Sequence, residues 1–501
     1  MSDYDVIVIG AGCGGLSAGA LLAKQGRRVL VLEQSNLIGG CCSTFERDGF
    51  HFDVGASIIE AIGTMETVFQ ALGTTLQREV ELIPADPIYS CIFQDGSRFN
   101  IPLSIDETAK AISEISPEDG KSFYRFVARF SKFTEGGGEG FFTSPATTLD
   151  DMANLLQKHP VIANFFPFFV ASYADVIEKF FKHDRVQQAM SYQSFYAGHP
   201  PDLTPGIFAI LPYLEHKGMY YPKGGMVEIP KALQRCGEQF GMQAQLNKRV
   251  KQVIVRNRRA CGVALADGTE ITADLVVSDI NAKTLYLDLI GEEHLPWLAR
   301  VGIKSYELSL TCPMIYLGLD YKPPLDAHHS LLLAPTRAMS DAWWNKYRRG
   351  IIPEPHEQFG LACTPTESDP SLAPAGHHVL NLILMGPYHL RGTDWDREKQ
   401  PFIERMLRHL SDTAIPGLTD HVKVVEMSSP LDFERRLLLP GGAIYGLQQD
   451  ITAQAVFRPS AKSKSIQGLY LVGASTHPGG GVPTTIGSGM IAAGLIEKYK
   501  K

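Results

Sequence analysis

Near the N-terminus, short apolar runs alternate with glycine-rich or polar breaks in the order strand, helix, strand. Asp5–Ile9 is rich in β-branched residues and ends at a glycine, which predicts a buried parallel strand. Small and apolar residues over Leu16–Gln25 predict a helix that ends at Gly26. Arg28–Glu33 predicts a second strand with an acid at its tip.

The C-terminal end of the chain shows a related pattern. Gly468–Ala474 predicts a strand that ends at a glycine, His477–Pro483 a tight loop, and Thr484–Ile496 a helix of small residues. In the middle of the chain, Arg249–Val255 has the composition of a further strand. Leu308–Thr311 and Met314–Leu317 are also strand-like.

Composition indicates a folded protein of two or three domains. The 501 residues are 44% hydrophobic and 20% charged, which is too apolar for a disordered chain. The formal net charge is −7, and this acidic balance argues against nucleic acid as a partner.

Neither a leader nor a membrane span is expected. The first residues are acidic, unlike a secretory signal, and no uncharged apolar stretch reaches the length of a bilayer span. The eight cysteines form no C-x-x-C pair, so we expect them to be reduced and buried in a cytoplasmic protein.

The first glycine loop has the spacing of a dinucleotide site. Gly10, Gly12 and Gly15 satisfy G-x-G-x-x-G directly between the predicted strand and helix, and Gly14 lies in the same loop. These glycines allow a tight turn, close approach of a pyrophosphate and close packing of the helix. The helix N-terminus favours phosphates, and Glu33 follows at the spacing of an acid that binds the ribose hydroxyls.

FAD rather than NAD is predicted by what lies beyond this loop. A second glycine pair, Gly39–Gly40, follows Glu33, and the segment 49–56 continues it. A glycine-rich loop that begins a helix at the C-terminus provides another polar binding device. Two such loops at opposite ends of the chain fit one extended FAD of the glutathione-reductase type. The further residues expected to contact it are Gly39, Gly40, Gly55, Val250, Gly473, Gly481, Val482 and Pro483.

These motifs resemble the phytoene desaturase family of FAD-dependent carotenoid desaturases, isomerases and saturases. The resemblance covers nearly the whole chain and is carried by GAGCGGLSAGALLAKQGRRVLVLEQ, DGFHFDVGAS, YYPKGGMVEIPKAL, DPSLAPAGHHVL and GLYLVGASTHPGGGVPTTIGSGMIAAGLI. Two features depart from the desaturase pattern. Cys41–Cys42 replaces the usual arginine after the second glycine pair, and Phe433–Arg436 with Gly446 is closer to the isomerase branch.

The resemblance implies an α/β fold with a discontinuous Rossmann-type FAD-binding domain and an inserted α+β substrate domain. We expect residues 1–75, 223–290 and 425–501 to form the first, and 76–222 and 291–424 to form the second.

One aromatic-rich segment, Leu155–Phe181, has two interpretations. It is broken by Pro167 and flanked by three lysines, Lys158, Lys179 and Lys182. It either forms a pair of core helices or dips into a membrane surface from which a carotene is collected.

The candidate catalytic residues are His477 and Asp151. His477 lies in the terminal loop, where it either hydrogen-bonds the flavin or relays a proton, or else shapes the loop. Asp151 resembles an acidic position suggested as acid/base in desaturases, or it caps a helix. The pairs His328–His329 and His377–His378 lack metal-ligand spacing, and we expect surface positions and no metal site.

The expected activity is desaturation of a phytoene-type polyene, with electrons passed from the flavin to a quinone or to oxygen. Isomerisation or saturation of a polyene is the alternative within the family. An FAD-dependent amine oxidase and a non-catalytic flavin- or lipid-binding protein are alternatives outside it. We expect a cytoplasmic enzyme that associates peripherally with membranes.

Overall fold

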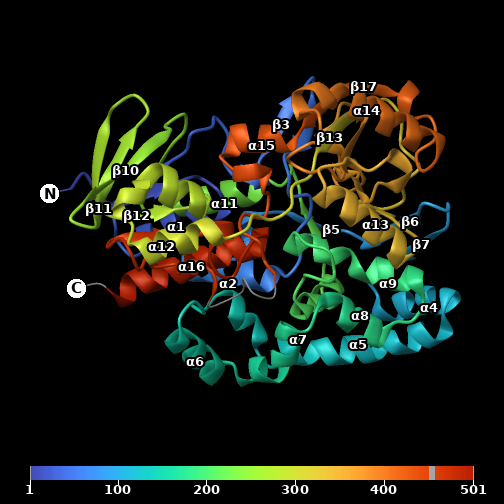
Figure 1. Cartoon of the computed structure of the whole chain (residues 1–501), viewed down its shortest axis with the longest axis horizontal. Helices are drawn as coiled ribbons and strands as arrows, with labels where there is room; N and C mark the ends of the chain where they lie inside the picture. The colour runs from blue at the N-terminus through green and yellow to red at the C-terminus, as the bar shows by residue number, and fades with distance from the viewer. Residues whose placement is uncertain (1, 451–456, 500–501) are drawn as a thin grey trace.

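The computed structural model describes residues 2–450 and 457–499 and places two seven-stranded sheets side by side (Figure 1). Six strands of the first sheet follow the order β10 (Val250–Arg256), β11 (Arg259–Leu265), β12 (Glu270–Ser278), β1 (Tyr4–Ile9), β2 (Val29–Leu32) and β9 (Gln243–Gln245). The seventh strand, β18 (Leu469–Leu471), pairs with β12.

The centre of this first sheet is parallel and buried. β1 lies between β2 and β12, and all three run in the same direction. Val6–Ile9 and all of β2 are buried, because helices cover one side and the β10–β11 ribbon with its neighbours covers the other. The predicted strands 5–9, 28–33, 249–255 and 468–474 are thereby confirmed to within a few residues.

Four helices pack against the first sheet and around its edge: α1 (Cys13–Lys24), α2 (Ile62–Leu72), α11 (Glu228–Glu238) and α16 (Val482–Lys498). Small residues let α1 and α16 approach closely. A Cβ added at Gly489 would lie 2.6 Å from the Ser17 hydroxyl, and that hydroxyl donates to the Ile486 carbonyl at 2.9 Å.

The second sheet is antiparallel except where β14 meets β6. Its order is β17 (Val422–Ser428), β13 (Met314–Leu319), β16 (His378–Ile383), β15 (Gly360–Cys363), β14 (His329–Leu333), β6 (Tyr89–Phe93) and β7 (Arg98–Ile101). Residue 425, the boundary expected from the sequence, falls inside β17, which pairs with β13. The expected strand 308–311 is wrong: only Leu308 forms an isolated bridge, with Leu447, because no neighbouring strand runs along the segment.

Helices α13 (Arg337–Arg348), α14 (Trp395–Asp412) and α15 (Pro430–Leu437) accompany the second sheet, and α12 (Trp297–Ser305) lies near the first. The short helix α3 (Leu76–Glu79) follows α2. Two further antiparallel pairs of strands lie outside the two large sheets: β3 (Thr44–Arg47) with β4 (Phe50–Asp53), and β5 (Leu82–Pro84) with β8 (Tyr220–Pro222).

A layer of helices lies along the lower side of the view in Figure 1. It comprises α4 (Ile105–Ile115), α5 (Pro117–Glu135), α6 (Leu149–Lys158), α7 (Phe166–Val170), α8 (Tyr173–Phe180), α9 (Asp184–Ser191) and α10 (Leu211–Glu215). Its core is aromatic, with Phe123, Phe126, Phe130, Phe133 and Phe165 all buried. Within the described residues, no helix is both long and apolar enough to cross a bilayer.

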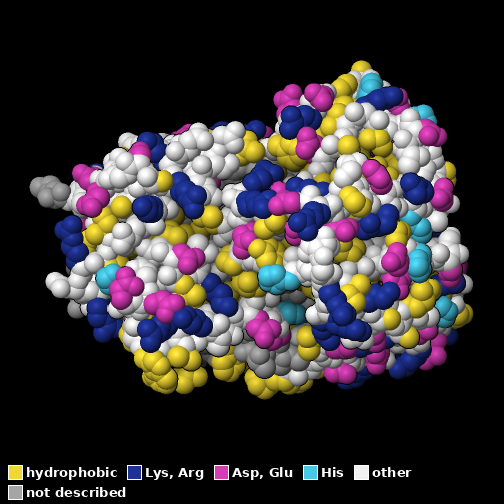
Figure 2. Space-filling model, turned by 45° about the horizontal axis from the view of Figure 1, so that its top comes forward, with side chains coloured by type: hydrophobic (Ala, Val, Ile, Leu, Met, Phe, Trp, Pro, Cys, Tyr) yellow, Lys and Arg dark blue, Asp and Glu magenta, His cyan; other side chains and the backbone are white. Residues whose placement is uncertain are grey.

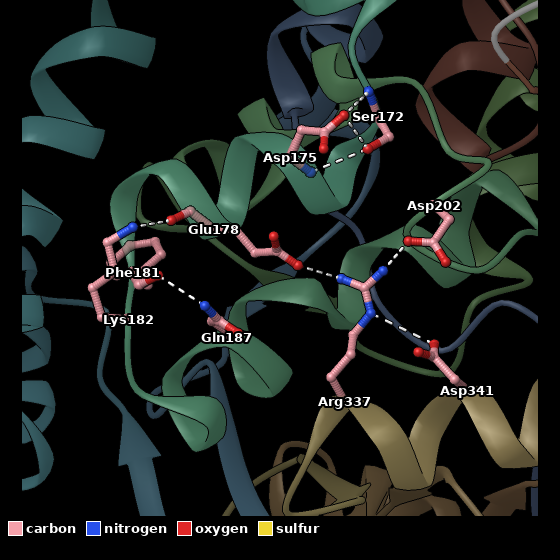
Figure 3. Close-up of polar contacts among 9 residues, drawn as sticks. All are labelled: Ser172, Asp175, Glu178, Phe181, Lys182, Gln187, Asp202, Arg337 and Asp341. Atoms are coloured by element: carbon pink, nitrogen blue, oxygen red, sulfur yellow. Dashed lines mark hydrogen bonds and ion pairs between the residues drawn. The ribbon is translucent and has the colours of Figure 1, made fainter.

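Arg337 ties this helical layer to the second sheet. From the start of α13 it forms ion pairs with Glu178 on α8, at 2.7 Å, with Asp202 in the loop over residues 199–205, and with Asp341 one turn along its own helix, at 3.5 Å (Figure 3). Ser172 and Asp175 form a capping box that begins α8 at the same place. The helical layer is therefore held against the sheet whose residues line the site described next.

Candidate functional site

The two glycine-rich ends of the chain meet. A Cβ added at Gly14 would lie 2.8 Å from the backbone nitrogen of Gly473, so the first and last loops are in direct contact. Gly473 N–H also donates to Ser488 on α16 at 2.7 Å. The two loops therefore meet, as the prediction of a single ligand between them requires.

A groove runs along this junction, and we call it the cofactor groove. It is lined by ten of the residues predicted to contact FAD: Gly10, Gly12, Gly14, Glu33, Gly39, Gly40, Gly55, Val250, Gly481 and Val482. Gly15 and Gly473 lie directly behind this lining, and Pro483 lies in the neighbouring cavity. The groove therefore extends from the end of β2 to the start of α16.

The residues at the start of α1 fit a diphosphate. Gly10 has a φ of +98°, which makes the turn off β1, and a Cβ at Gly15 would lie 2.2 Å from the Gly10 carbonyl oxygen. A side chain at Gly12 would enter the groove, where its Cβ would meet an oxygen of Asp279 at 2.4 Å. These three glycines keep side chains away from the helix N-terminus, whose amides favour an anion; in this structure one of them, the Gly15 N–H, donates to Asp279.

Glu33 occupies the position expected for a ribose-binding acid. Its carboxylate accepts from the N–H of Ala11 at 2.9 Å and of Ser35 at 2.8 Å, which fixes it at the groove beside Lys248 and Val250. The residue set thus offers a helix N-terminus for phosphates and a held carboxylate for a ribose, as FAD requires.

Asp279 is a residue of this site that the sequence analysis missed. It follows β12, lines the groove and accepts from Gly15 N–H at 2.9 Å. Burial raises the pKa of its carboxyl to about 7; the Gly15 N–H opposes this shift and the charge of Glu33 adds to it. The rule that ligands bind beyond the carboxyl ends of parallel strands could have pointed to it.

A second space, the apolar cavity, opens on the groove. The two share Gly55, Ala56, Cys312, Ile383, Ile444, Tyr445, Gly481 and Val482. Aromatic and aliphatic side chains of the helical layer line the rest, among them Phe133, Phe141, Phe169, Phe208, Ile210 and Leu214. Among the described residues, Glu60 is the one acidic or basic side chain in this lining.

His477 does not line the groove or the cavity. It is buried, with an Nε2 that lies 2.8 Å from the Phe141 carbonyl and a ring packed edge-on against the Phe141 ring. Burial lowers the pKa of His477 to about 4, so the ring is neutral and its Nε2–H donates to that carbonyl. In this structure His477 joins the terminal loop to the helical layer, which corresponds to the loop-shaping alternative.

Asp151 also lies outside the lining of both spaces. It is in the first turn of α6, where its backbone N–H donates to the hydroxyl of Thr148, the residue that caps the helix. A catalytic role for Asp151 stays a prediction that this geometry does not support.

The expected surface position of His328 and His329 is wrong. Both rings are buried beside Cys363. His328 directly precedes β14, and His329 is the first residue of this strand, where it pairs with Cys363 of β15. His328 contacts Ser368 and the Ser57 carbonyl at 2.7 and 3.1 Å, and His329 contacts the Ser57 hydroxyl at 3.0 Å. Burial lowers the pKa of His328 to about 4 and holds that of His329 well below its ordinary value, so these neutral rings support the Ser57 segment.

Comparison with known proteins places this geometry in context. Residues 13–496 match the flavin containing amine oxidoreductase family. The chain is 29% identical over 496 residues to a lycopene-forming phytoene desaturase of Paracoccus sp., covering 98% of this chain and 96% of that one. It is 28% identical over 499 residues to a 4,4'-diapolycopene oxygenase of Methylomonas sp., covering 98% and 97%.

Solved structures share the fold. An oxidoreductase from Methanosarcina mazei superimposes with a TM-score of 0.61 at 17% identity over 98% of this chain and 99% of that one. Putrescine oxidase bound to putrescine gives 0.63 at 14% identity over 99% of each chain. The comparisons confirm the predicted α/β fold and FAD as the cofactor.

The charge of Asp279 predicts a pH-dependent affinity for FAD. Above pH 7 its ionised carboxylate faces the diphosphate site, so the affinity of the apoprotein should fall about tenfold between pH 6 and 8. Asp279→Asn should bind FAD with little dependence on pH in a flavin fluorescence titration. Asp267→Asn, in an exposed turn, is the matched control, and an unchanged pH dependence in Asp279→Asn would contradict the interpretation.

The buried contact of His477 predicts a structural role. His477→Phe leaves the Phe141 carbonyl without its donor and should lower the free energy of unfolding by about 1–3 kcal/mol, while the visible flavin spectrum is retained. Because the unfolded ring binds a proton more readily, wild-type stability should fall as the pH drops from about 6.5 towards 4. Thermal unfolding across this range checks both, and a loss of turnover without a loss of stability would favour catalysis instead.

Proposed function

The chain belongs to the flavin containing amine oxidoreductase family and is related over 98% of its length to phytoene desaturases, and on that premise we propose that it desaturates a carotenoid-type polyene. The expected substrate is a phytoene-like hydrocarbon, in which the enzyme converts a carbon–carbon single bond into a double bond. The observation that carries this proposal is the apolar cavity that opens directly on the cofactor groove.

The chemistry of the cavity suits a hydrocarbon. A polyene has no ionised group that needs a partner, and most of the lining is aromatic or aliphatic. An amine substrate would be expected to meet a base such as lysine, and no lysine occurs among the described residues of the lining. This difference favours the polyene over the amine oxidase alternative.

The residues of the chain would act mainly by positioning. FAD, when bound, supplies the acceptor for a hydride taken from the substrate. Gly55, Ala56 and Val482 border both spaces and would let the polyene approach the groove closely, and Tyr445 and Cys312 border both spaces as well. Phenylalanines from the helical layer would exclude water from the reacting carbons.

A membrane surface is the proposed source of the substrate. Phe169 of α7 lines the cavity, whereas Phe166 and Val170 on the same helix are 66% and 57% exposed. In the same helical layer, Leu149 at the start of α6 is 82% exposed. On the face seen in Figure 2, hydrophobic side chains gather in clumps along the lower edge, and charges of both signs are spread over the rest. We name Leu149, Phe166 and Val170 the apolar helix surface.

The apolar helix surface would sit in the outer part of a bilayer, one helix away from the cavity. Lys158, Lys179 and Lys182 are close to it in sequence and would face anionic headgroups. A quinone in the same membrane, or oxygen, would then reoxidise the flavin.

The desaturase proposal predicts that phytoene reduces the flavin. Under anaerobic conditions, adding phytoene in detergent or vesicles to the FAD-loaded enzyme should bleach the oxidised flavin absorbance, and pigment extraction should yield more unsaturated products. A change of double-bond geometry without net bleaching would indicate the isomerase alternative. If no polyene changes the flavin or is itself changed, the proposal is wrong.

The membrane proposal predicts loss of vesicle binding on charging the apolar helix surface. The double variant Phe166→Glu, Val170→Glu should lower binding to phosphatidylglycerol vesicles at least about tenfold, since each buried side chain contributes about 1.5–3 kcal/mol. Co-sedimentation measures this, and Met339→Glu on α13, 45% exposed, is the matched control. Wild-type binding by the double variant would contradict the assignment.

A further inference from the structure

A pair of glutamates stands apart from the otherwise apolar cavity. Glu60 precedes α2 and lines the cavity, and Glu215 ends α10 and is only 2% exposed. Their carboxyl groups hydrogen-bond to each other. Neither residue was singled out by the sequence, because they are 155 positions apart and lie in no motif.

Glu215 is held by donors on two other elements. The hydroxyl of Tyr89, at the start of β6, donates to its Oε1 at 2.6 Å, and the side-chain amide of Gln193 donates to its Oε2 at 2.9 Å. Tyr196, which lines the cavity, contacts the Tyr89 hydroxyl at 2.7 Å. Three donors, with Glu60 as the third, favour the ionised form of Glu215.

Glu60 is the partner that carries the shared proton. Burial, followed by the charge of Glu215 and the hydrogen bond to it, raises the pKa of Glu60 well above its usual range. For Glu215, burial raises the pKa while Tyr89, Gln193 and Glu60 lower it. The two carboxyl groups therefore share one proton, because two carboxyls at close range cannot both ionise.

The other titratable groups around the pair are neutral at pH 7. Burial raises the pKa of Tyr89, Tyr173, Tyr192, Tyr196 and Cys91, and the negative charge of Glu215 adds to each shift. Burial is the largest cause in each case. The proton of the pair is therefore shared within a shell of uncharged hydroxyl and thiol groups.

One oxygen of Glu60 has no partner. Its Oε2 is buried and makes no hydrogen bond to any described residue, although the other members of the network are satisfied. The following residue, Ala61, has a φ of +50°, a left-handed conformation that L residues adopt at a cost. Glu60 thus borders the cavity with one enclosed oxygen that has no partner, next to a residue in a left-handed conformation.

Glu60 lies on a segment of the cavity wall that leads to the cofactor groove. This segment begins with Gly55 and Ala56, which line both spaces. Tyr445 also lines both spaces. A substrate in the cavity would contact the wall that holds Glu60 and extend towards the groove.

We infer that Glu60 is the catalytic base of the reaction and that Glu215 is the positioning residue that receives its proton. FAD, when bound, would supply the acceptor for a hydride from one C–H bond of the substrate. The neighbouring C–H bond would give its proton to the carboxyl oxygen of Glu60 that borders the cavity, and its electron pair would become the new π bond. The proton already on Glu60 passes to Glu215, so the pair ends with two protons, one of which must return to solvent before the next turnover.

This inference rests on the proposed desaturase function, so its test separates the two. In the anaerobic reaction with phytoene, Glu60→Gln should keep its FAD and slow flavin reduction about 10²–10⁴-fold, the usual contribution of a general base. Glu215→Gln should shift the pH profile of that rate rather than abolish it, because Glu60 retains its own acceptor oxygen. Glu81→Gln, an exposed carboxylate paired with Lys223, is the matched control and should behave as wild type.

A second measurement needs no turnover. Infrared difference spectra of wild type minus Glu60→Gln, recorded without substrate in H₂O and D₂O, should contain the band of a protonated carboxylic acid at pH 7. If that band is missing, or if Glu60→Gln reduces its flavin at the wild-type rate with an unchanged pH profile, the inference is overturned. A third result is possible: phytoene does not reduce the wild-type flavin although the carboxylic acid band is present. The desaturase proposal is then wrong, and the assignment of Glu60 as its catalytic base is wrong with it.

Discussion

The close contact between the first and last glycine loops is the constraint on which the rest of the structure depends. Helices α1 and α16 approach because glycine, alanine and serine face each other across them, and the loops at their N-termini then meet at Gly14 and Gly473. A larger side chain at either position would push the two ends of the chain apart. The groove, the anion site and the junction with the cavity all exist because this contact holds.

The site lies between two parts of the fold that differ in polarity. The first sheet is parallel, with its polar binding devices at the carboxyl ends of β1, β2 and β12. The second sheet and the helical layer are packed from aromatic and aliphatic side chains, and they enclose an apolar space. Their shared boundary is where a polar cofactor and a hydrocarbon can be brought to the same point.

Buried carboxyl groups lie both at the groove and at the cavity. Asp279 at the groove and the Glu60–Glu215 pair at the cavity are each far from full solvation, and burial is the largest cause of the raised pKa in each. Elsewhere in the interior, buried histidines such as His328 and His477 stay neutral and support the backbone through hydrogen bonds. Burial thus separates groups that hold the fold from groups that are available for proton chemistry.

The sequence alone determined the strands and helices around both glycine loops, the FAD groove residues and the kinship with carotenoid desaturases, because these depend on local patterns of apolar residues and glycine spacing. It did not locate Asp279, Glu60 or Glu215, and it misplaced His328 and His329. Those side chains come together from segments far apart in the chain, so their burial and their partners follow from packing rather than from neighbours in sequence. Tertiary structure decided where charge lies in the cavity, since only the folded chain determines which carboxyls lose water and which share a proton.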